Sequence, residues 1–196
     1  MKKIWLPFIG GRKRKVSRKK NVSVMLMCLV VLSLSGCTYK SRGDYLAKVA
    51  RDEDKQSDEM MNSIVDALET QDAEALKNLF STYALEHAED LDEKIEEIID
   101  FFSGSNGGYE GNCISERKAN YGDITLILTG TYTVTNERQE YMVNFITMPQ
   151  NDEEPDKVGL YLIEVMTEEA EPEGFKWRNE EDEPGIYVLE PQEKHW

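Results

Sequence analysis

The chain has 196 residues, enough for one ordinary domain with further segments, and it carries 38 acidic against 23 basic residues, a net charge of −15. Nine of the basic residues and none of the acidic ones lie in residues 1–36, so residues 37–196 hold 38 acids against 14 bases, a net charge of about −24. A surface this acidic repels phosphate, which excludes nucleic acid as a partner and electrostatic attraction to anionic lipid as a membrane anchor.

The first predicted element is a secretory signal over residues 1–36. A basic block is followed by the apolar run 22–34 and then by Ser35-Gly36-Cys37, the order typical of a signal peptide. The apolar run is short for a bilayer span, which takes about 20 residues. Together with Leu34, the three residues resemble the lipobox of bacterial lipoproteins at every position. This resemblance implies cleavage between Gly36 and Cys37, with a diacylglyceryl group on the Cys37 thiol.

An acylated Cys37 makes the lipid bilayer the first expected partner and places the chain on the extracytoplasmic side of the cell membrane. Two or more acyl chains hold a protein where one does not, since each buried methylene contributes about 0.8 kcal/mol. The alternative is an uncleaved helical anchor in which Cys37 has no role. Because Cys28 leaves with the signal, Cys113 is the only other thiol, so we expect no intramolecular disulfide and interpret Cys113 as a packing residue.

After the signal we expect a polar tether over residues 37–55, which can run into the first helix, and then a single α+β domain over residues 56–196 with an acidic C-terminal segment. Three helices begin this domain. The first is capped by Ser57 or Asp54, the second by Asp72, and the third by Asp90 and Glu93 at capping-box spacing. Their apolar stripes are Met60, Met61, Ile64, Val65 and Leu68, then Leu76, Leu79, Phe80 and Tyr83, then Leu91, Ile95, Ile98, Ile99 and Phe102.

Beyond the flexible Gly- and Ser-rich segment 103–108, the hydrophobic pattern changes to a period of two. Four strands are predicted, at 113–120, 124–134, 140–148 and 158–167, and their short connections favour antiparallel pairing. Gly130 lies in mid-strand and indicates a bulge or bend. Helices followed by strands are typical of an α+β fold with helices on one face of the sheet. The apolar segments 175–177 and 184–188 are interpreted as patches docked on the domain between solvated acidic loops.

The stretch from Ile64 to Val165 resembles the nuclear-transport-factor-2-like superfamily of cone-shaped, cystatin-like α+β domains. The helix pair 64–68 and 72–81, the long Thr-rich strand and Val158-Gly159-Leu160 carry this resemblance. With the lipobox, the chain is similar to an uncharacterised bacterial lipoprotein family, domain-of-unknown-function family 5104. The resemblance implies a curved antiparallel sheet wrapped by helices, with a pocket at the open end. It implies no activity, because the superfamily hosts both enzymes and binding domains.

Side chains that carry chemistry are scarce in this sequence. His87 and His195 are the only histidines, which leaves too few ligands for a zinc site, and we interpret His87 as an exposed loop residue. The acidic loop 151–156 lacks the alternating ligands and central glycine of an EF-hand, so we interpret it as a solvated turn. A nucleophile elbow and a phosphate loop are both absent from the sequence. We therefore predict no metal and no cofactor.

In isomerases and dehydratases of the superfamily, an acidic or histidine base projects into the cone beside a tyrosine. The matching residue types here are Asp66, Asp72, Tyr132 and Tyr141, but no family motif assigns a catalytic role to any of them. Asp72 has a simpler role as a helix cap, and the tyrosines can half-fill the sheet face. We predict no catalytic residue and take Tyr132, Tyr141 and Phe145 as candidate pocket residues.

Three functions are compatible with these observations. The first is a non-enzymatic, membrane-anchored binding domain that holds a small apolar or amphipathic ligand, or an envelope protein, in the mouth of the cone. The alternative is an enzyme of the polyketide-cyclase or isomerase kind that uses a buried carboxylate with a raised pKa. The third is a purely structural role, with side chains filling the pocket. A buried acid or histidine without a structural partner would favour the enzyme.

Overall fold

The computed structural model describes residues 18–102 and 104–190, with the side chains of residues 18–41 and of Asn106 excepted. The chain divides into two units, residues 1–47 and 48–196, and helix α1 (Arg18–Thr70) begins in the first and ends in the second. The predicted cleavage and lipidation site, Gly36 and Cys37, falls among the residues whose side chains lie outside this description, as does much of the predicted signal. Within the described residues, no helix combines the length and apolar character needed to cross a membrane.

The second unit starts on α1, whose residues from Lys48 onward are helical through the end of the predicted tether. The predicted apolar stripe is buried there, with Met61, Ile64 and Leu68 almost fully enclosed. Ser57 and Glu53, one and two turns before Met61, are buried as well. Glu53 accepts hydrogen bonds from Ser115 Oγ at 2.7 Å and Arg117 Nη2 at 3.0 Å. The helix therefore contacts the sheet from residue 53 onward, earlier than its apolar stripe alone indicates.

The predicted second helix is wrong as a single element, because the chain forms two short helices, α2 (Ala73–Lys77) and α3 (Thr82–His87). Asp72 caps α2 as predicted, by accepting from the Ala75 amide at 2.8 Å. Ser81 interrupts the helical hydrogen bonding between α2 and α3. Its amide donates to Leu160 O in the sheet at 2.9 Å, and its hydroxyl caps α3 by accepting from the Ala84 amide. A tertiary hydrogen bond has replaced the helical one at this position.

Helix α4 (Leu91–Phe101) buries the stripe predicted for the third helix. The predicted capping box is wrong, since the Asp90 side chain makes no cap hydrogen bond. Asp90 instead adopts the left-handed backbone conformation, with φ of 50°, which only a minority of non-glycine residues adopt. This conformation turns the chain sharply between α3 and α4.

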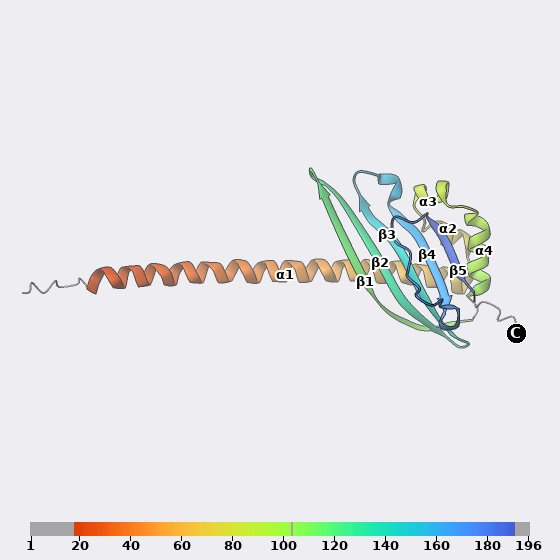
Figure 1. Cartoon of the computed structure of the whole chain (residues 1–196), viewed down its shortest axis with the longest axis horizontal. Helices are drawn as coiled ribbons and strands as arrows, with labels where there is room; N and C mark the ends of the chain where they lie inside the picture. Colours follow the sequence, from red (N-terminus) through yellow and green to blue (C-terminus); the bar gives the residue numbers. More distant parts are fainter. Residues whose placement is uncertain (1–17, 103, 191–196) are drawn as a thin grey trace, which may run out of the picture. The chain divides into compact units, whose positions relative to one another are not determined.

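Within residues 104–190, the chain forms one open sheet of five strands, in the order β1-β2-β3-β4-β5 (Figure 1). The first four strands pair antiparallel with their sequence neighbours, as predicted, whereas the last pairs parallel with β4 and was missed as a strand. The strands are β1 (Asn106–Asn120), β2 (Asp123–Asn136), β3 (Glu140–Asn151), β4 (Gly159–Thr167) and β5 (Gly185–Leu189), with 3-10 helices at Pro155–Lys157 and Glu168–Ala170. The α+β class is confirmed, with helices in the N-terminal part and a mostly antiparallel sheet.

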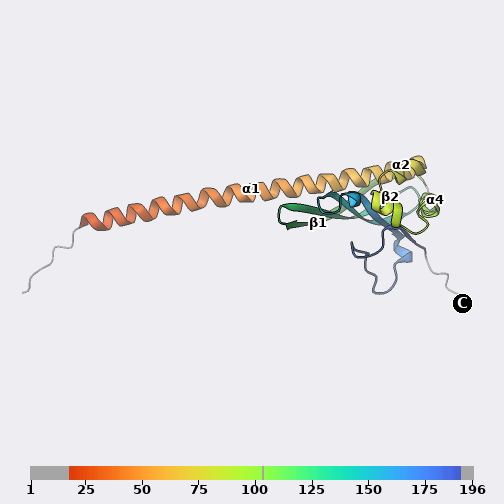
Figure 2. The ribbon, with the colours of Figure 1, turned by 90° about the horizontal axis from the view of Figure 1, so that it is seen from above.

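The two faces of the sheet have different covers. Helices cover one face and enclose the main core, while the segment between β4 and β5 lies on the opposite side (Figure 2). We call residues 171–184 the covering segment. It is held by a hydrogen bond from the Tyr161 hydroxyl to Asp182 O at 3.0 Å and by contacts at Arg178. This second face has a small apolar cluster of its own, formed by Ile127, Ile146, Met148, Tyr161 and Leu162.

Gly130 does not form the predicted bulge, because the register shifts of β2 and β3 lie elsewhere, at Leu126/Leu128 and Ile146/Thr147. Its role is steric. A Cβ atom at Gly130 would lie 2.5 Å from Phe145 Cζ and 2.8 Å from Tyr132 Cε2. A Cβ atom at Gly111, on β1, would lie 2.5 Å from Tyr132 Cδ1. The two glycines let these aromatic rings lie against the sheet.

Candidate functional site

The three predicted pocket residues all lie in the core between the sheet and the helices. Tyr132 and Phe145 stack with ring centroids 5.9 Å apart, and the Tyr132 hydroxyl donates to Asp58 Oδ1 at 2.8 Å. Tyr141 packs against Phe101 and donates to its carbonyl at 3.1 Å. Tyr132 also borders a hollow of about 510 Å³, whose rim includes Trp177 of the covering segment. The structure thus places these rings as packing groups with satisfied hydroxyls.

The carboxylates singled out in the sequence are exposed on helices. Asp66 accepts a hydrogen bond from Asn62 Nδ2 at 3.0 Å, and Asp72 caps α2. In the part of the chain whose side chains the structure describes, the buried carboxylates are Glu53 and Glu164, which the sequence pattern did not single out. Neither of them borders the hollow of about 510 Å³ or the larger groove described below.

Glu164, on β4, lies under the covering segment. Its Oε2 accepts from the Arg178 amide at 2.9 Å, and Arg178 Nε lies 3.7 Å from Oε1. Burial raises the pKa of Glu164, and the hydrogen bond and positive charge of Arg178 oppose this effect. The flanking Asn144 Nδ2 and the Arg178 Nε are buried without a hydrogen-bond partner. Glu164 thus fixes Arg178 on this face of the sheet.

The thiol and the potential metal ligands offer little chemistry. Cys113 is half-buried on β1, and burial raises the pKa of its thiol, which keeps it protonated and a poor nucleophile. In the part of the chain that the structure describes, no three His, Cys, Asp or Glu side chains are grouped so that they could hold a metal ion.

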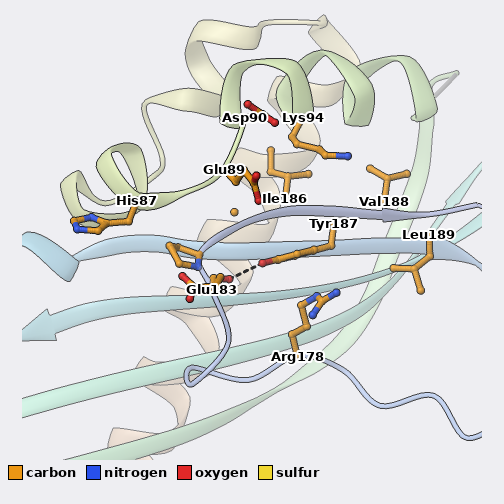
Figure 3. Close-up of a pocket in the computed structure, with 12 residues that line it drawn as sticks. His87, Glu89, Asp90, Lys94, Arg178, Glu183, Ile186, Tyr187, Val188 and Leu189 are labelled. Carbon is orange, nitrogen blue, oxygen red and sulfur yellow. Dashed lines mark hydrogen bonds between the residues drawn. The ribbon is translucent and has the colours of Figure 1, made fainter.

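The most distinctive concave feature is a groove of about 600 Å³ beside β5, which we call the β5 groove (Figure 3). One wall comes from the end of α3, the following turn and α4. The other wall comes from the covering segment, and β5 lies between them. The lining residues are His87, Glu89, Asp90, Lys94, Arg178, Glu183, Pro184 and Gly185–Leu189.

Among the strands that the structure describes, β4 is the only neighbour of β5, so β5 is an edge strand. Ile186 and Val188 point toward α4, whereas Tyr187 and Leu189 point toward Arg178 (Figure 3). All four side chains line the groove, so the groove wraps around the free edge of the strand. Backbone N–H and C=O groups along such an edge are open to pairing with another chain.

The wall formed by the covering segment is held in place by aromatic and polar contacts. The Arg178 guanidinium lies over the Tyr187 ring, 3.8 Å from its centroid. The Tyr187 hydroxyl donates to Glu183 O at 2.8 Å, drawn as a dashed line in Figure 3. Together with the Glu164 contacts, these interactions fix Arg178 between the sheet and the groove.

His87 lies at the Glu183 end of the groove (Figure 3) and is stacked on Tyr83, with centroids 4.1 Å apart. Its Nδ1 lies 2.9 Å from Tyr83 O. Because a carbonyl only accepts, Nδ1 is the donor in this hydrogen bond. His87 is exposed, as predicted, but it is the last residue of α3 rather than a loop residue.

The groove was missed in the sequence for two reasons. Lys94 and Arg178 have no motif around them, and β5 is too short for a period-two pattern to stand out. The signal that could have found the strand is Pro184-Gly185, a break followed by Ile186-Tyr187-Val188, three residues of high strand propensity. The sequence pattern alone indicates only a docked patch for this segment.

A family model described as "Domain of unknown function (DUF5104)" matches residues 63–168, just over half of the chain. The chain belongs to this family. Among curated proteins, none matches the sequence. The DUF5104 region runs from the last turns of α1 to the end of β4, and so contains His87, Glu89, Asp90 and Lys94. The covering segment and β5 follow it, and the DUF5104 region therefore supplies one wall of the β5 groove.

Proposed function

We propose that this chain is an extracytoplasmic lipoprotein, anchored through acylated Cys37, whose domain binds an envelope protein in the β5 groove. The observation that carries the proposal is the free edge of β5 lying inside a groove of about 600 Å³ with walls on both sides. An extended polypeptide can add to such an edge, where main-chain hydrogen bonds give affinity and the walls give specificity.

The lining favours a polypeptide over a small apolar ligand. The charged or ionisable side chains that line the groove are those of Glu89, Asp90, Lys94, Arg178, Glu183 and His87. An apolar molecule would cover these groups without giving them partners, which is unfavourable. A peptide offers both main-chain groups for the strand and polar side chains for the walls.

The anchor is supported by the lipobox resemblance and by the charge distribution. Residues 37–196 carry about −24, which opposes attraction to an anionic bilayer, so membrane association needs a covalent lipid. We further propose that the α+β domain is a member of the nuclear-transport-factor-2-like superfamily. Helices over one face of an antiparallel sheet support this finer assignment.

The enzyme alternative is less well supported. An isomerase-like mechanism needs a buried carboxylate that is open to substrate. Glu164 has the raised pKa, but its oxygens face Arg178 and it does not line the β5 groove. Its contacts favour a structural role.

The anchor is tested by Cys37→Ala in the native host, with Cys113→Ala as the matched control. We expect Cys37→Ala to leave an unlipidated precursor that no longer enters the detergent phase, while Cys113→Ala is processed as wild type. Mass spectrometry of the N-terminal fragment and detergent phase partitioning give the result. Normal processing and partitioning of Cys37→Ala would contradict the assignment.

The groove is tested by placing a photo-crosslinking amino acid at Leu189, which lines it, and separately at Tyr121, which is fully exposed in the β1–β2 turn. In intact cells we expect a discrete adduct with one envelope protein from position 189 and none from position 121. Identical adducts from both positions, or none from position 189, would count against binding in the groove.

A further inference from the structure

We infer that the β5 groove takes a basic segment in extended conformation, which adds to β5 as a further strand. This inference rests on the proposed function and names the class of partner. The net negative charge of residues 37–196 supports a basic partner, because a strongly negative domain attracts positively charged segments over distances comparable with the Debye length.

The groove holds carboxylates that no cation neutralises. Among the described residues, no salt bridge reaches Glu89, Asp90 or Glu183. The two basic residues of the groove are already engaged with acids outside it. Lys94 pairs with Glu97, and Arg178 pairs with Glu164. The charge left without a partner in the groove is therefore negative.

Lys94 does not reverse this balance. Its hydrogen bond to Glu97 is the main cause of its raised pKa, and Asp90 makes a smaller contribution through its charge. Asp90 thus lies within electrostatic reach of Lys94 but forms no ion pair with it. A second cation, supplied by a ligand, would complete the pairing of Asp90 and its neighbours.

The carboxylates are placed so that side chains on both faces of an added strand can meet them. Glu89 and Asp90 lie on the α4 side of β5, and Glu183 lies on the opposite side (Figure 3). Alternate residues of an extended peptide point to opposite sides, so successive basic residues can each find an acid. A Cβ atom at Gly185 would lie 3.6 Å from Ala88 Cβ, which places the turn before α4 at this end of the strand.

The other end of the groove is apolar. Val188 and Leu189 line it beyond the charged residues, on opposite sides of β5 (Figure 3). The segment that fits best therefore has Lys or Arg where it passes Gly185 and apolar residues where it passes Leu189. A second copy of this chain fits poorly, because pairing two β5 strands would bring the same carboxylates together.

The test uses the full lipidated chain in neutral detergent micelles and three fluorescein-labelled decapeptides, in which five consecutive Lys, Glu or Gln residues are joined to five Val residues (the Lys-Val, Glu-Val and Gln-Val peptides). Fluorescence anisotropy measures the affinity of each peptide. We expect the Lys-Val peptide to bind at least tenfold more tightly than the other two. We expect the double variant Glu89→Gln/Glu183→Gln to weaken that binding at least tenfold. The matched control, Glu137→Gln/Glu169→Gln, removes the same charge from exposed positions outside the groove and should change it less than twofold.

Strand addition has its own readout. N-methylation of alternate residues removes the donors from one edge of an extended peptide. We expect methylation of one alternate set in the Lys-Val peptide to abolish binding and methylation of the other set to leave it unchanged. Equal loss from both sets, or from neither, would overturn strand addition.

The charge inference fails if the three peptides bind equally, or if the two double variants weaken the Lys-Val peptide to the same extent. In that case the adduct at position 189 would still support polypeptide binding in the groove. If no peptide binds and position 189 gives no adduct, the proposed function fails as well. The two results therefore separate the class of partner from the existence of the site.

Discussion

At the scale of single residues, two positions determine how the helices pack on one face of the sheet and the covering segment on the other. Gly130 lets the aromatic rings lie flat under the helices, and Glu164 holds Arg178 under the covering segment. Each can be changed without altering the rest of the chain, and each gives a distinct prediction.

Gly130→Ala should destabilise the domain. The new Cβ would lie 2.5 Å from Phe145 Cζ, in a region where both rings are enclosed, and overpacking of this kind costs about 1–3 kcal/mol. Urea denaturation followed by circular dichroism measures the loss. Adding Phe145→Leu to Gly130→Ala should recover part of it, because the smaller side chain removes the clash. An additive double variant would show that the clash is not the cause.

A comparison of the wild type with Glu164→Gln tests whether the contribution of Glu164 to stability falls or rises with pH. Burial raises the pKa of Glu164 in the fold above its ordinary value of 4.5, so the fold prefers the protonated form. The folded state then holds more protons than the unfolded state between the two pKa values, and stability from this group is lost as the pH rises through that window. Relative to Glu164→Gln, the wild type should therefore be more stable near pH 4.5 than near pH 7.

Urea denaturation across this pH range gives the difference between the two proteins. Glu168→Gln, at an exposed position after β4, is the control and should track the wild type at every pH. A stability difference between wild type and Glu164→Gln that does not change with pH would contradict the prediction.

At the scale of elements, the length of each segment decided whether it could be predicted. The stripes of α1 and α4 and the alternation of β2 and β3 extend over enough residues for their periods to be clear, and these elements were found. The predicted start of the first helix was wrong, because α1 is continuous through both Asp54 and Ser57. α2, α3 and β5 have five or six residues each, and their bounds depend on contacts with β4. Such contacts are not encoded in local periodicity.

The same reasoning explains why the candidate site was predicted only in part. Asp72 was found as a cap because capping depends on residues three positions apart. The groove joins a turn near residue 89 to a strand near residue 187, and no local pattern links them. Asp90 was assigned a cap, but its backbone took the left-handed conformation that the turn requires.

The break between α2 and α3 makes a prediction at this scale. Ser81→Ala removes the hydroxyl that accepts from the Ala84 amide, at a position that is almost fully buried. We expect a loss of about 1–2 kcal/mol, because a cap is lost and a buried donor is left unsatisfied. Hydrogen exchange at Ala84, measured with urea denaturation, should show faster opening of α3. Ser81→Thr keeps the hydroxyl and should lose less stability; equal losses would mean that the cap does not stabilise α3.

At the scale of the whole molecule, charge is the dominant property. Residues 37–196 carry about −24, and a net charge of this size destabilises a compact state through self-repulsion. The same field attracts a basic partner. Salt screens both effects, but it should change stability and binding in opposite directions.

Raising NaCl from 10 to 150 mM shortens the Debye length from about 30 to about 8 Å. The melting temperature of the domain should rise over this range, because repulsion among the acids is screened, while the affinity for the Lys-Val peptide should fall. Thermal denaturation and fluorescence anisotropy on one protein sample measure the two trends. If the melting temperature falls with salt, the paired acids outweigh the repelling ones. If peptide affinity is insensitive to salt, the unpaired carboxylates of the β5 groove do not attract the ligand.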